Sequence, residues 1–320
     1  MRGQPSQLKE LIHVSTALIT SQADLACTIP SMLGFQPEES AVLVFEKNGS
    51  VVCTARADLE TEQVTATVAH VAAHAPTSVS LVVYTSQDAT AAAAHVERLT
   101  AAVEPWLTCH GGYVRSNMYY SQGKAPRRLD HTPAAVAAFT AAGTVTAGSR
   151  GEAMDMVTAT RPDAGVAAAL VTATIPDTAG SRRHVEDAVV AYLTSHTPPP
   201  DPATIAGWLI AMNASEIREP VLKRLSEADT SGRDHAARML ALVQLAPRVE
   251  QAAAATALAA ALIWLTGDCA RAHALAQEAT RANPANVLGE LVTQACANGM
   301  PPEIFTDAIA AMTLDQVRKT

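Results

Sequence analysis

The chain has 320 residues, of which 48% are hydrophobic and only 4% aromatic, and it carries a formal net charge of −8. This length predicts two domains, and an apolar content carried largely by alanine favours closely packed helices. Because neither half of the chain is basic, the charge argues against a dedicated nucleic-acid-binding protein and leaves room only for a local patch. The basic cluster that stands out is Arg127-Arg128 with Lys124 nearby. We interpret it as solvated loop charge, with phosphate contact as the alternative.

The cysteines indicate a reducing compartment. They are odd in number and widely spaced, they include no Cys-x-x-Cys pair, and they stand at positions 27, 53, 109, 269 and 296. This usage is typical of buried reduced thiols in a cytoplasmic protein. No apolar core of an export signal is visible near the N-terminus, and the longest apolar run, Ala252 to Leu265, is too short and too rich in alanine to span a bilayer. We therefore expect a cytoplasmic protein with no membrane partner.

The first predicted elements are a helix and a β-hairpin. Helical spacing runs from Gln7 to Ile29, Ser21 followed by Asp24 is a helix-start signal, and Gly34 is expected to end the helix. Two apolar segments follow, and the dipeptide Asn48-Gly49 between them supplies the positive φ angles of a tight type I′ turn. The predicted strands of the hairpin cover Ser40 to Glu46 and Ser50 to Ala57.

Helices and strands then alternate. The expected elements are a helix over residues 61–75, a strand over 78–84, an alanine-rich helix from Asp88 to Pro105, and two short strands within 106–120. This order predicts an α/β domain with a mixed sheet. The segment Ala41 to Phe45 is apolar at every position rather than alternating, so helices are expected on both faces of the sheet.

The second half of the chain has helical spacing almost throughout. We predict an α/β domain over residues 1–145 and an all-α helical domain over 146–320, which begins at a capping box formed by Ser149 and Glu152. The spacing of Gly267, Ala272, Ala279 and Pro284 matches the second half of a tetratricopeptide repeat. We therefore expect tetratricopeptide-like helix pairs, preceded by helices over 202–212, 216–227 and 234–246.

The residues that we single out for ligand binding lie at the ends of predicted elements. Arg56 and Asp58 share a face at the end of the hairpin's second strand, where a structural ion pair is the favoured interpretation and ligand binding is the alternative. His110 is a further candidate, because α/β folds place ligands at the carboxyl ends of sheet strands. Ser149 and Arg150 could hold an anion where free amides and the helix dipole converge, although an ordinary helix cap uses the same residues.

Metal and catalytic signatures are weak or missing. His70 and His74 stand four apart on a predicted helix, but the sequence supplies no third and fourth ligand, so we predict no metal site. The chain contains no phosphate-binding loop, dinucleotide fingerprint, nucleophile elbow, kinase set or zinc framework. We therefore predict no catalytic residue and no cofactor.

Our leading hypothesis is a non-enzymatic protein-interaction or regulatory module. Its partner would be an unidentified protein or peptide bound in a groove of the helical domain, for which we single out Trp264, Arg271 and His273. The alternative is an α/β enzyme or small-ligand sensor that acts on a phosphorylated or anionic metabolite. A homo-oligomeric assembly is a third hypothesis.

The segment from Pro30 to Ser40, read PSMLGFQPEES, resembles the opening signature of the actinobacterial family called domain of unknown function 4192. The resemblance continues in order through ARADL at 55–59, HTP at 131–133, SRGEA at 149–153, WLTGD at 264–268 and NGMPP at 298–302. One departure is the segment from Met118 to Ser121, which has no cysteine. The resemblance implies a distribution in actinobacteria and their phages, and it implies no activity.

Overall fold

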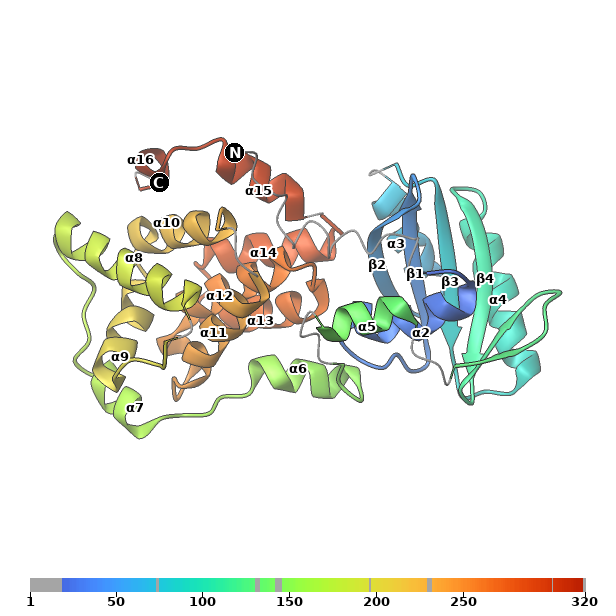
Figure 1. The fold of residues 1–320 in the computed structure, drawn as a ribbon, viewed down its shortest axis with the longest axis horizontal. Coiled ribbons are helices and arrows are strands. Elements are labelled where there is room, and N and C mark those ends of the chain that lie inside the picture. Colours follow the sequence, from blue (N-terminus) through green and yellow to red (C-terminus); the bar gives the residue numbers. More distant parts are fainter. Residues whose placement is uncertain are drawn as a thin grey trace. The chain divides into compact units, whose positions relative to one another are not determined.

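The structure is a computed structural model that describes residues 19–72, 75–129, 133–141, 146–195, 197–228, 232–300 and 302–318. The chain divides into two compact units, and the division falls between Ala153 and Met154, within helix α6 (Arg150–Thr158). We refer to them as the sheet unit and the helical unit (Figure 1). The boundary that we place between residues 145 and 146 stays a prediction.

The sheet unit is built on a mixed sheet, as the sequence predicts. Within the described residues it has six strands in the order β2-β1-β3-β4-β5-β6. Only β3 and β4 pair in parallel, and the other neighbours are antiparallel. The strands are β1 (Ser40–Lys47), β2 (Ser50–Asp58), β3 (Ser78–Tyr84), β4 (Thr108–Arg115), β5 (Met118–Ser121) and β6 (Arg127–Arg128). Strand β6 falls in the segment that we expected to be a loop, where it pairs with the end of the β4–β5 hairpin.

The first hairpin confirms the predicted turn. Asn48 has a φ of 53° and Gly49 a φ of 76°, as a type I′ turn requires, and β1 and β2 pair antiparallel on either side. Strand β1 lies in the interior of the sheet, and every residue from Ala41 to Phe45 is 0% exposed. Its unbroken apolar run is therefore explained by burial on both faces.

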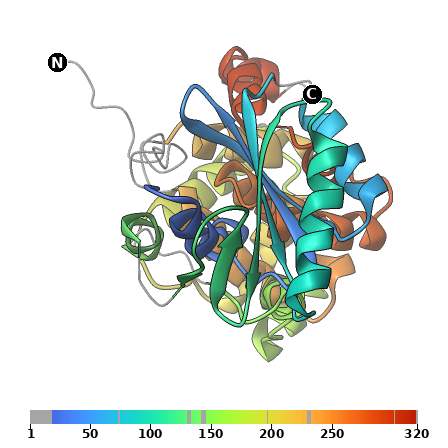
Figure 2. The ribbon, with the colours of Figure 1, turned by 90° about the vertical axis from the view of Figure 1, so that its right-hand side faces the viewer.

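Helices cover both faces of this sheet (Figure 2). One face packs the apolar sides of α3 (Thr61–Ala72) and α4 (Ala89–Val103) against alternate strand residues such as Leu43 and Leu81. The other face lies under α2 (Gln22–Leu33), which packs against α5 (Ala134–Ala141) and whose Gln22 side chain donates to the hydroxyl of Ser80 at 3.1 Å. Successive strand residues point to opposite faces, so both sides of a buried strand can be apolar.

Helix α2 begins and ends at the predicted signals. Ser21 caps its start and Gly34, with a φ of 76°, ends it, as expected. The helix nevertheless passes through Pro30, because the carbonyl of Ala26, which loses its helical donor there, accepts a hydrogen bond from Tyr84 instead. The predicted helical spacing before residue 19 lies outside the described residues.

The helical unit consists of helices with short connections. The predicted helices over 202–212, 216–227 and 234–246 are confirmed as α9, α10 and α11. The elements are α7 (Ala164–Leu170), α8 (Ala179–Thr194), α9 (Pro202–Ala211), α10 (Ser215–Ser226), α11 (Gly232–Gln244), a 3-10 turn η2 (Val249–Gln251), α12 (Ala253–Leu265), α13 (Cys269–Ala282), α14 (Val287–Ala297), α15 (Pro302–Ala310) and α16 (Leu314–Val317).

Helix α12 is the centre of this unit. Every residue from Ala253 to Trp264 is buried, and the helix packs against α10, α11, α13 and α14. A helix that is apolar on all sides is expected to be enclosed by other helices. None of the helices in the described ranges combines the length and the apolar character needed to cross a membrane.

Candidate functional site

Arg56 and Asp58 form the predicted ion pair at the end of β2. A guanidinium nitrogen of Arg56 lies 2.5 Å from a carboxylate oxygen of Asp58. The Asp58 side chain is 50% exposed, and its backbone amide donates to the side chain of Gln63 at the start of α3. The ion pair lies within β2, and the backbone amide of Asp58 makes the contact with α3.

His110 does not join that pair. Strands β2, β3 and β4 run in the same direction, and Asp58 lies at the carboxyl end of β2, in register with Val114 across the sheet. His110 lies near the amino end of β4, opposite Ser80. His110 lies four residues from Asp58 along the strand direction, which is about 13 Å, and three strand spacings from it across the sheet, which is about 14 Å. The expectation that His110 shares a site with Arg56 and Asp58 is wrong.

Ser149 caps α6 as predicted. Its hydroxyl accepts from the amide of Glu152 at 3.1 Å. The carboxylate of Glu152 accepts from the amide of Gly148 at 2.7 Å, one residue before the expected partner of a capping box. A carboxylate of the chain itself therefore occupies the place where an external anion would bind, while Arg150 is exposed.

The aromatic residue of the predicted partner groove lies in the core of the helical unit. Trp264 is 0% exposed and its ring contacts that of Phe305 on α15, with centroids 5.4 Å apart. Arg271 turns back to the carboxylate of Asp268 at 2.5 Å, and His273 is half-buried. The proposed role of Trp264 at a surface is wrong, because α12 is buried on every side.

Histidine and acidic residues assemble no metal site in the described ranges, where no group of three or more His, Cys, Asp or Glu residues could hold an ion. His74, the second member of the histidine pair singled out from the sequence, lies outside the described residues.

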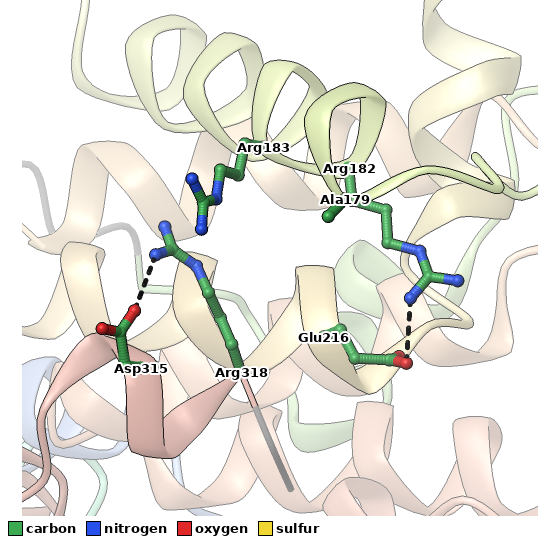
Figure 3. Close-up of a pocket in the computed structure, with 6 residues that line it drawn as sticks. All are labelled: Ala179, Arg182, Arg183, Glu216, Asp315 and Arg318. Atoms are coloured by element: carbon green, nitrogen blue, oxygen red, sulfur yellow. Dashed lines mark hydrogen bonds and ion pairs between the residues drawn. The ribbon is translucent and has the colours of Figure 1, made fainter.

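A cavity of about 380 Å³ opens among three helices of the helical unit. We call it the arginine pocket, and Figure 3 shows its lining. Helix α8 contributes its first turn, α10 contributes one carboxylate, and the C-terminal helix α16 contributes an acidic and a basic side chain. The lining residues are Ala179, Arg182, Arg183, Glu216, Asp315 and Arg318.

Two of the three arginines of this pocket are fixed by carboxylates. Arg182 contacts Glu216 at 3.1 Å and donates to the carbonyl of Pro176 at 2.9 Å. Arg318 donates to both oxygens of Glu186, at 3.1 and 3.0 Å, and Glu186 is only 1% exposed. Both guanidinium groups are therefore held at the rim of the cavity by bonds of their own.

Arg183 is different. It has no hydrogen-bonding or ion-pair partner within the part of the chain that the structure describes, and its guanidinium points toward that of Arg318 (Figure 3). The carboxylate of Asp315 beside it is 80% exposed and lies 3.5 Å from Arg318. Helix α8 also begins here, after its cap Thr178, so the positive end of its dipole adds to the local potential. The arrangement can receive a carboxylate or phosphate oxygen.

The sequence contained one local signal of this pocket. The adjacent Arg182-Arg183 just after a helix-start residue is a basic pair comparable with Arg127-Arg128, and we overlooked it. Asp315 and Arg318 could not be added from sequence, because 132 residues separate Arg318 from its partner Glu186.

A family model described as domain of unknown function (DUF4192) matches residues 23–303. No curated protein and no solved structure matches the chain.

Proposed function

We propose that the chain, which belongs to the DUF4192 family of domains of unknown function, is a non-enzymatic interaction module whose helical unit binds an acidic segment of a protein partner. The observation that carries this proposal is the guanidinium of Arg183, which has no partner among the described residues and faces a cavity of about 380 Å³ beside Arg318. The sequence supports a non-enzymatic role, since it contains none of the familiar catalytic motifs.

Guanidinium chemistry explains why an acidic side chain fits. A guanidinium binds a carboxylate through two parallel N–H···O bonds, and such charge-assisted bonds are stronger than those between neutral groups. None of the donors of Arg183 is used by another described residue. Arg318 can share its outer edge, because Asp315 is 80% exposed and lies at the long distance of 3.5 Å. An incoming carboxylate would therefore displace Asp315 and bridge the two arginines.

The overall negative charge of the chain does not prevent this contact. The formal net charge is −8, but charges farther away than a Debye length of about 8 Å are largely screened at physiological ionic strength. The pocket lining contributes three arginines, of which Arg182 and Arg318 pair with Glu216 and Glu186, so Arg183 carries the charge that no described carboxylate pairs. The local field, and not the net charge, determines which ligand enters.

The helix pairs support the view that the unit is a scaffold for binding. Gly267 has a φ of 86° between α12 and α13, and Ala272 and Ala279 are 0% exposed where these helices pack together. Small residues at such positions let two helices approach closely. We include tetratricopeptide-like pairing and a cytoplasmic location in the proposal, the latter because of the widely spaced cysteines.

A free anionic metabolite is the second candidate ligand. The volume of the arginine pocket lies in the lower part of the range of about 300 to 1,000 Å³ that is typical of small-molecule sites. A phosphate group would satisfy the same guanidinium donors. The experiment therefore has to compare a peptide with a small anion.

The test is a binding measurement on the full chain with a labelled oligoglutamate peptide, followed by fluorescence anisotropy. We expect binding that weakens with added salt and that falls by about tenfold or more in Arg183→Glu, because charge-assisted bonds are lost and a repulsion is introduced. Arg161→Glu is the matched control, since it reverses an exposed arginine of the helical unit that does not line the pocket, and it should bind as the wild type does.

The outcomes separate the candidates. Equal binding by the wild type and Arg183→Glu, or equal binding of an oligoglutamine peptide, would overturn the proposed site. Binding of inorganic phosphate that depends on Arg183, together with no binding of the peptide, would replace the protein partner by a small anion.

A further inference from the structure

Two cysteines of the helical unit lie far apart in the sequence and side by side in the fold. Cys269 is the first residue of α13, and Cys296 is the last but one of α14. These two helices pack against each other, and the thiols of the two cysteines form a hydrogen bond. All five cysteines lie in the described residues, and none of them forms a disulfide.

The two thiols are not equivalent. The hydrogen bond from Cys296 lowers the pKa of Cys269, against the effects of burial and of the nearby Asp268. Cys269 also follows the helix cap Asp268 directly, so it lies at the positive end of α13, where a thiolate is favoured. The same hydrogen bond, together with burial, raises the pKa of Cys296. The pair therefore combines a thiolate-forming sulfur with a protonated neighbour.

The pair lies at the boundary of the core of the helical unit. Both cysteines are partly exposed and pack against the edge of the core rather than inside it. Arg271 forms an ion pair with Asp268 at 2.5 Å, which reduces the repulsion that Asp268 would exert on a thiolate. Neither cysteine lines the arginine pocket, so this feature is separate from the proposed binding site.

We propose that Cys269 and Cys296 form a reversible dithiol–disulfide switch that responds to peroxide. The Cys269 thiolate attacks one peroxide oxygen, the O–O bond breaks, and the leaving hydroxide takes up a proton to become water, so that Cys269 becomes a sulfenic acid. The sulfur of Cys296 then attacks the sulfenic sulfur, the S–O bond breaks, and the hydroxyl leaves as water with the proton of Cys296. Two thiols are oxidised to one disulfide and one peroxide molecule is reduced to two water molecules.

The consequence is a covalent connection between the start of α13 and the end of α14. A disulfide restricts the unfolded chain and stabilises the folded one, so the oxidised helical unit should melt at a higher temperature than the reduced one. A thiol reductant reverses the reaction by thiol–disulfide exchange. The switch thus changes the rigidity of one helix pair without any other ligand.

The test treats the reduced full chain with hydrogen peroxide and analyses it by intact mass and peptide mapping. We expect the loss of two hydrogens, one crosslinked peptide that joins Cys269 to Cys296, and a rise in melting temperature that dithiothreitol reverses. Cys296→Ser should stop at a sulfenic acid that dimedone captures on Cys269. Cys269→Ser should slow peroxide consumption by more than about tenfold, because the thiolate is the nucleophile.

Cys109→Ser is the matched control. Burial raises the pKa of Cys109 to about 11, so its replacement should leave both the rate and the crosslink unchanged. Peptide mapping of the wild-type chain needs no variant, and it remains decisive if a substitution prevents folding. A disulfide that involves another cysteine, or oxidation to sulfinic acid without any crosslink, would overturn the proposal.

Discussion

The hydroxyl of Tyr84 donates a hydrogen bond of 2.7 Å to the backbone carbonyl of Ala26. In an uninterrupted helix this carbonyl would accept from the amide of residue 30, but Pro30 has no N–H group. Tyr84 is the last residue of β3 and is only 3% exposed. A strand residue therefore supplies the donor that the helix lacks, and it attaches helix α2 to the sheet just before the signature segment that begins at Pro30.

Replacing Tyr84 by phenylalanine should destabilise the sheet unit. The change leaves the Ala26 carbonyl buried without a donor, which costs about 1 to 3 kcal/mol. Urea unfolding followed by circular dichroism measures the effect. Tyr113→Phe is the control, because the hydroxyl of Tyr113 makes no hydrogen bond among the described residues, and its loss should change the unfolding free energy by less than about 0.5 kcal/mol.

The same relationship predicts a rescue by a change at Pro30. Pro30→Ala restores a backbone N–H four residues after Ala26, so the helix can satisfy that carbonyl itself. In the background of Pro30→Ala, the Tyr84→Phe change should therefore cost less than it does alone. A double-mutant cycle on unfolding free energies gives the coupling directly. Strict additivity of the two changes would contradict the proposed exchange of donors.

Local chemistry explains which parts of the sheet unit could be predicted. Three features were predictable because each depends on its own backbone or on near neighbours in the sequence. They are the Asn48-Gly49 turn, the unbroken apolar strand β1 and Gly34 at the end of helix α2. The Gly111-Gly112 pair needs more distant information. Both glycines lie inside β4 and not in the turn that follows. A Cβ atom on Gly111 would clash with α4 on one face of the sheet, and a Cβ atom on Gly112 would clash with Tyr119 on the other.

Gly111→Ala should destabilise the sheet unit for this reason. A Cβ atom at this position would lie 2.5 Å from the hydroxyl of Thr100 and 2.7 Å from a methyl group of Val96, both on α4. Such overpacking costs about 1 to 3 kcal/mol, measurable as a fall in the urea midpoint. Gly207→Ala in α9 is the contrasting control, because a Cβ there would meet no described atom within 4 Å outside its chain neighbours and the nearby backbone of its own helix, and alanine favours the helix by about 0.5 to 1 kcal/mol.

The arginine pocket shows the limit of sequence analysis for the candidate site. Its side chains come from helices that are far apart in the sequence, and the geometry depends on the buried Glu186, whose partners Arg224 and Arg318 are also distant in the sequence. The incorrect placement of Trp264 has a related cause. The periodicity of one segment cannot show that α12 is enclosed on all sides by helices from elsewhere in the chain.

Glu186→Gln should destabilise the helical unit far more than Asp187→Asn. Both carboxylates contact Arg224, at 3.0 and 2.6 Å, but Glu186 is 1% exposed and Asp187 is 68% exposed. Loss of the buried charge also releases Arg318. Removing one member of a buried ion pair destabilises a protein by about 3 kcal/mol. The loss of unfolding free energy should be smaller here, because Arg224 and Arg318 both reach solvent. The exposed pair is worth about 0 to 1 kcal/mol. Equal urea midpoints for the two variants would contradict this assignment.

Glu39 gives the sheet unit a pH-dependent contact. Its carboxylate accepts from the amide and the hydroxyl of Ser86, at 2.6 and 2.7 Å, and from the hydroxyl of Thr85 at 2.9 Å. The bond from the Ser86 amide is the main cause that lowers the pKa of Glu39 below its usual value of 4.5. These bonds favour the charged form, and they connect the turn before β1 to the loop after β3.

Because the pKa of Glu39 is lower in the folded chain than in the unfolded one, its contribution is present above the unfolded pKa and is lost as the pH falls through the folded pKa. Glu39→Gln should therefore be less stable than the wild type at pH 7, by about 0.5 to 1 kcal/mol for so exposed a group. The difference should shrink as the pH falls below 4.5 and through the lowered pKa.

Urea unfolding at a series of pH values measures this difference in stability. Glu38→Gln is the control, because it loses no hydrogen bond among the described residues and should match the wild type at pH 7. A difference that stays constant down to about pH 3 would show that the charge of Glu39 contributes nothing.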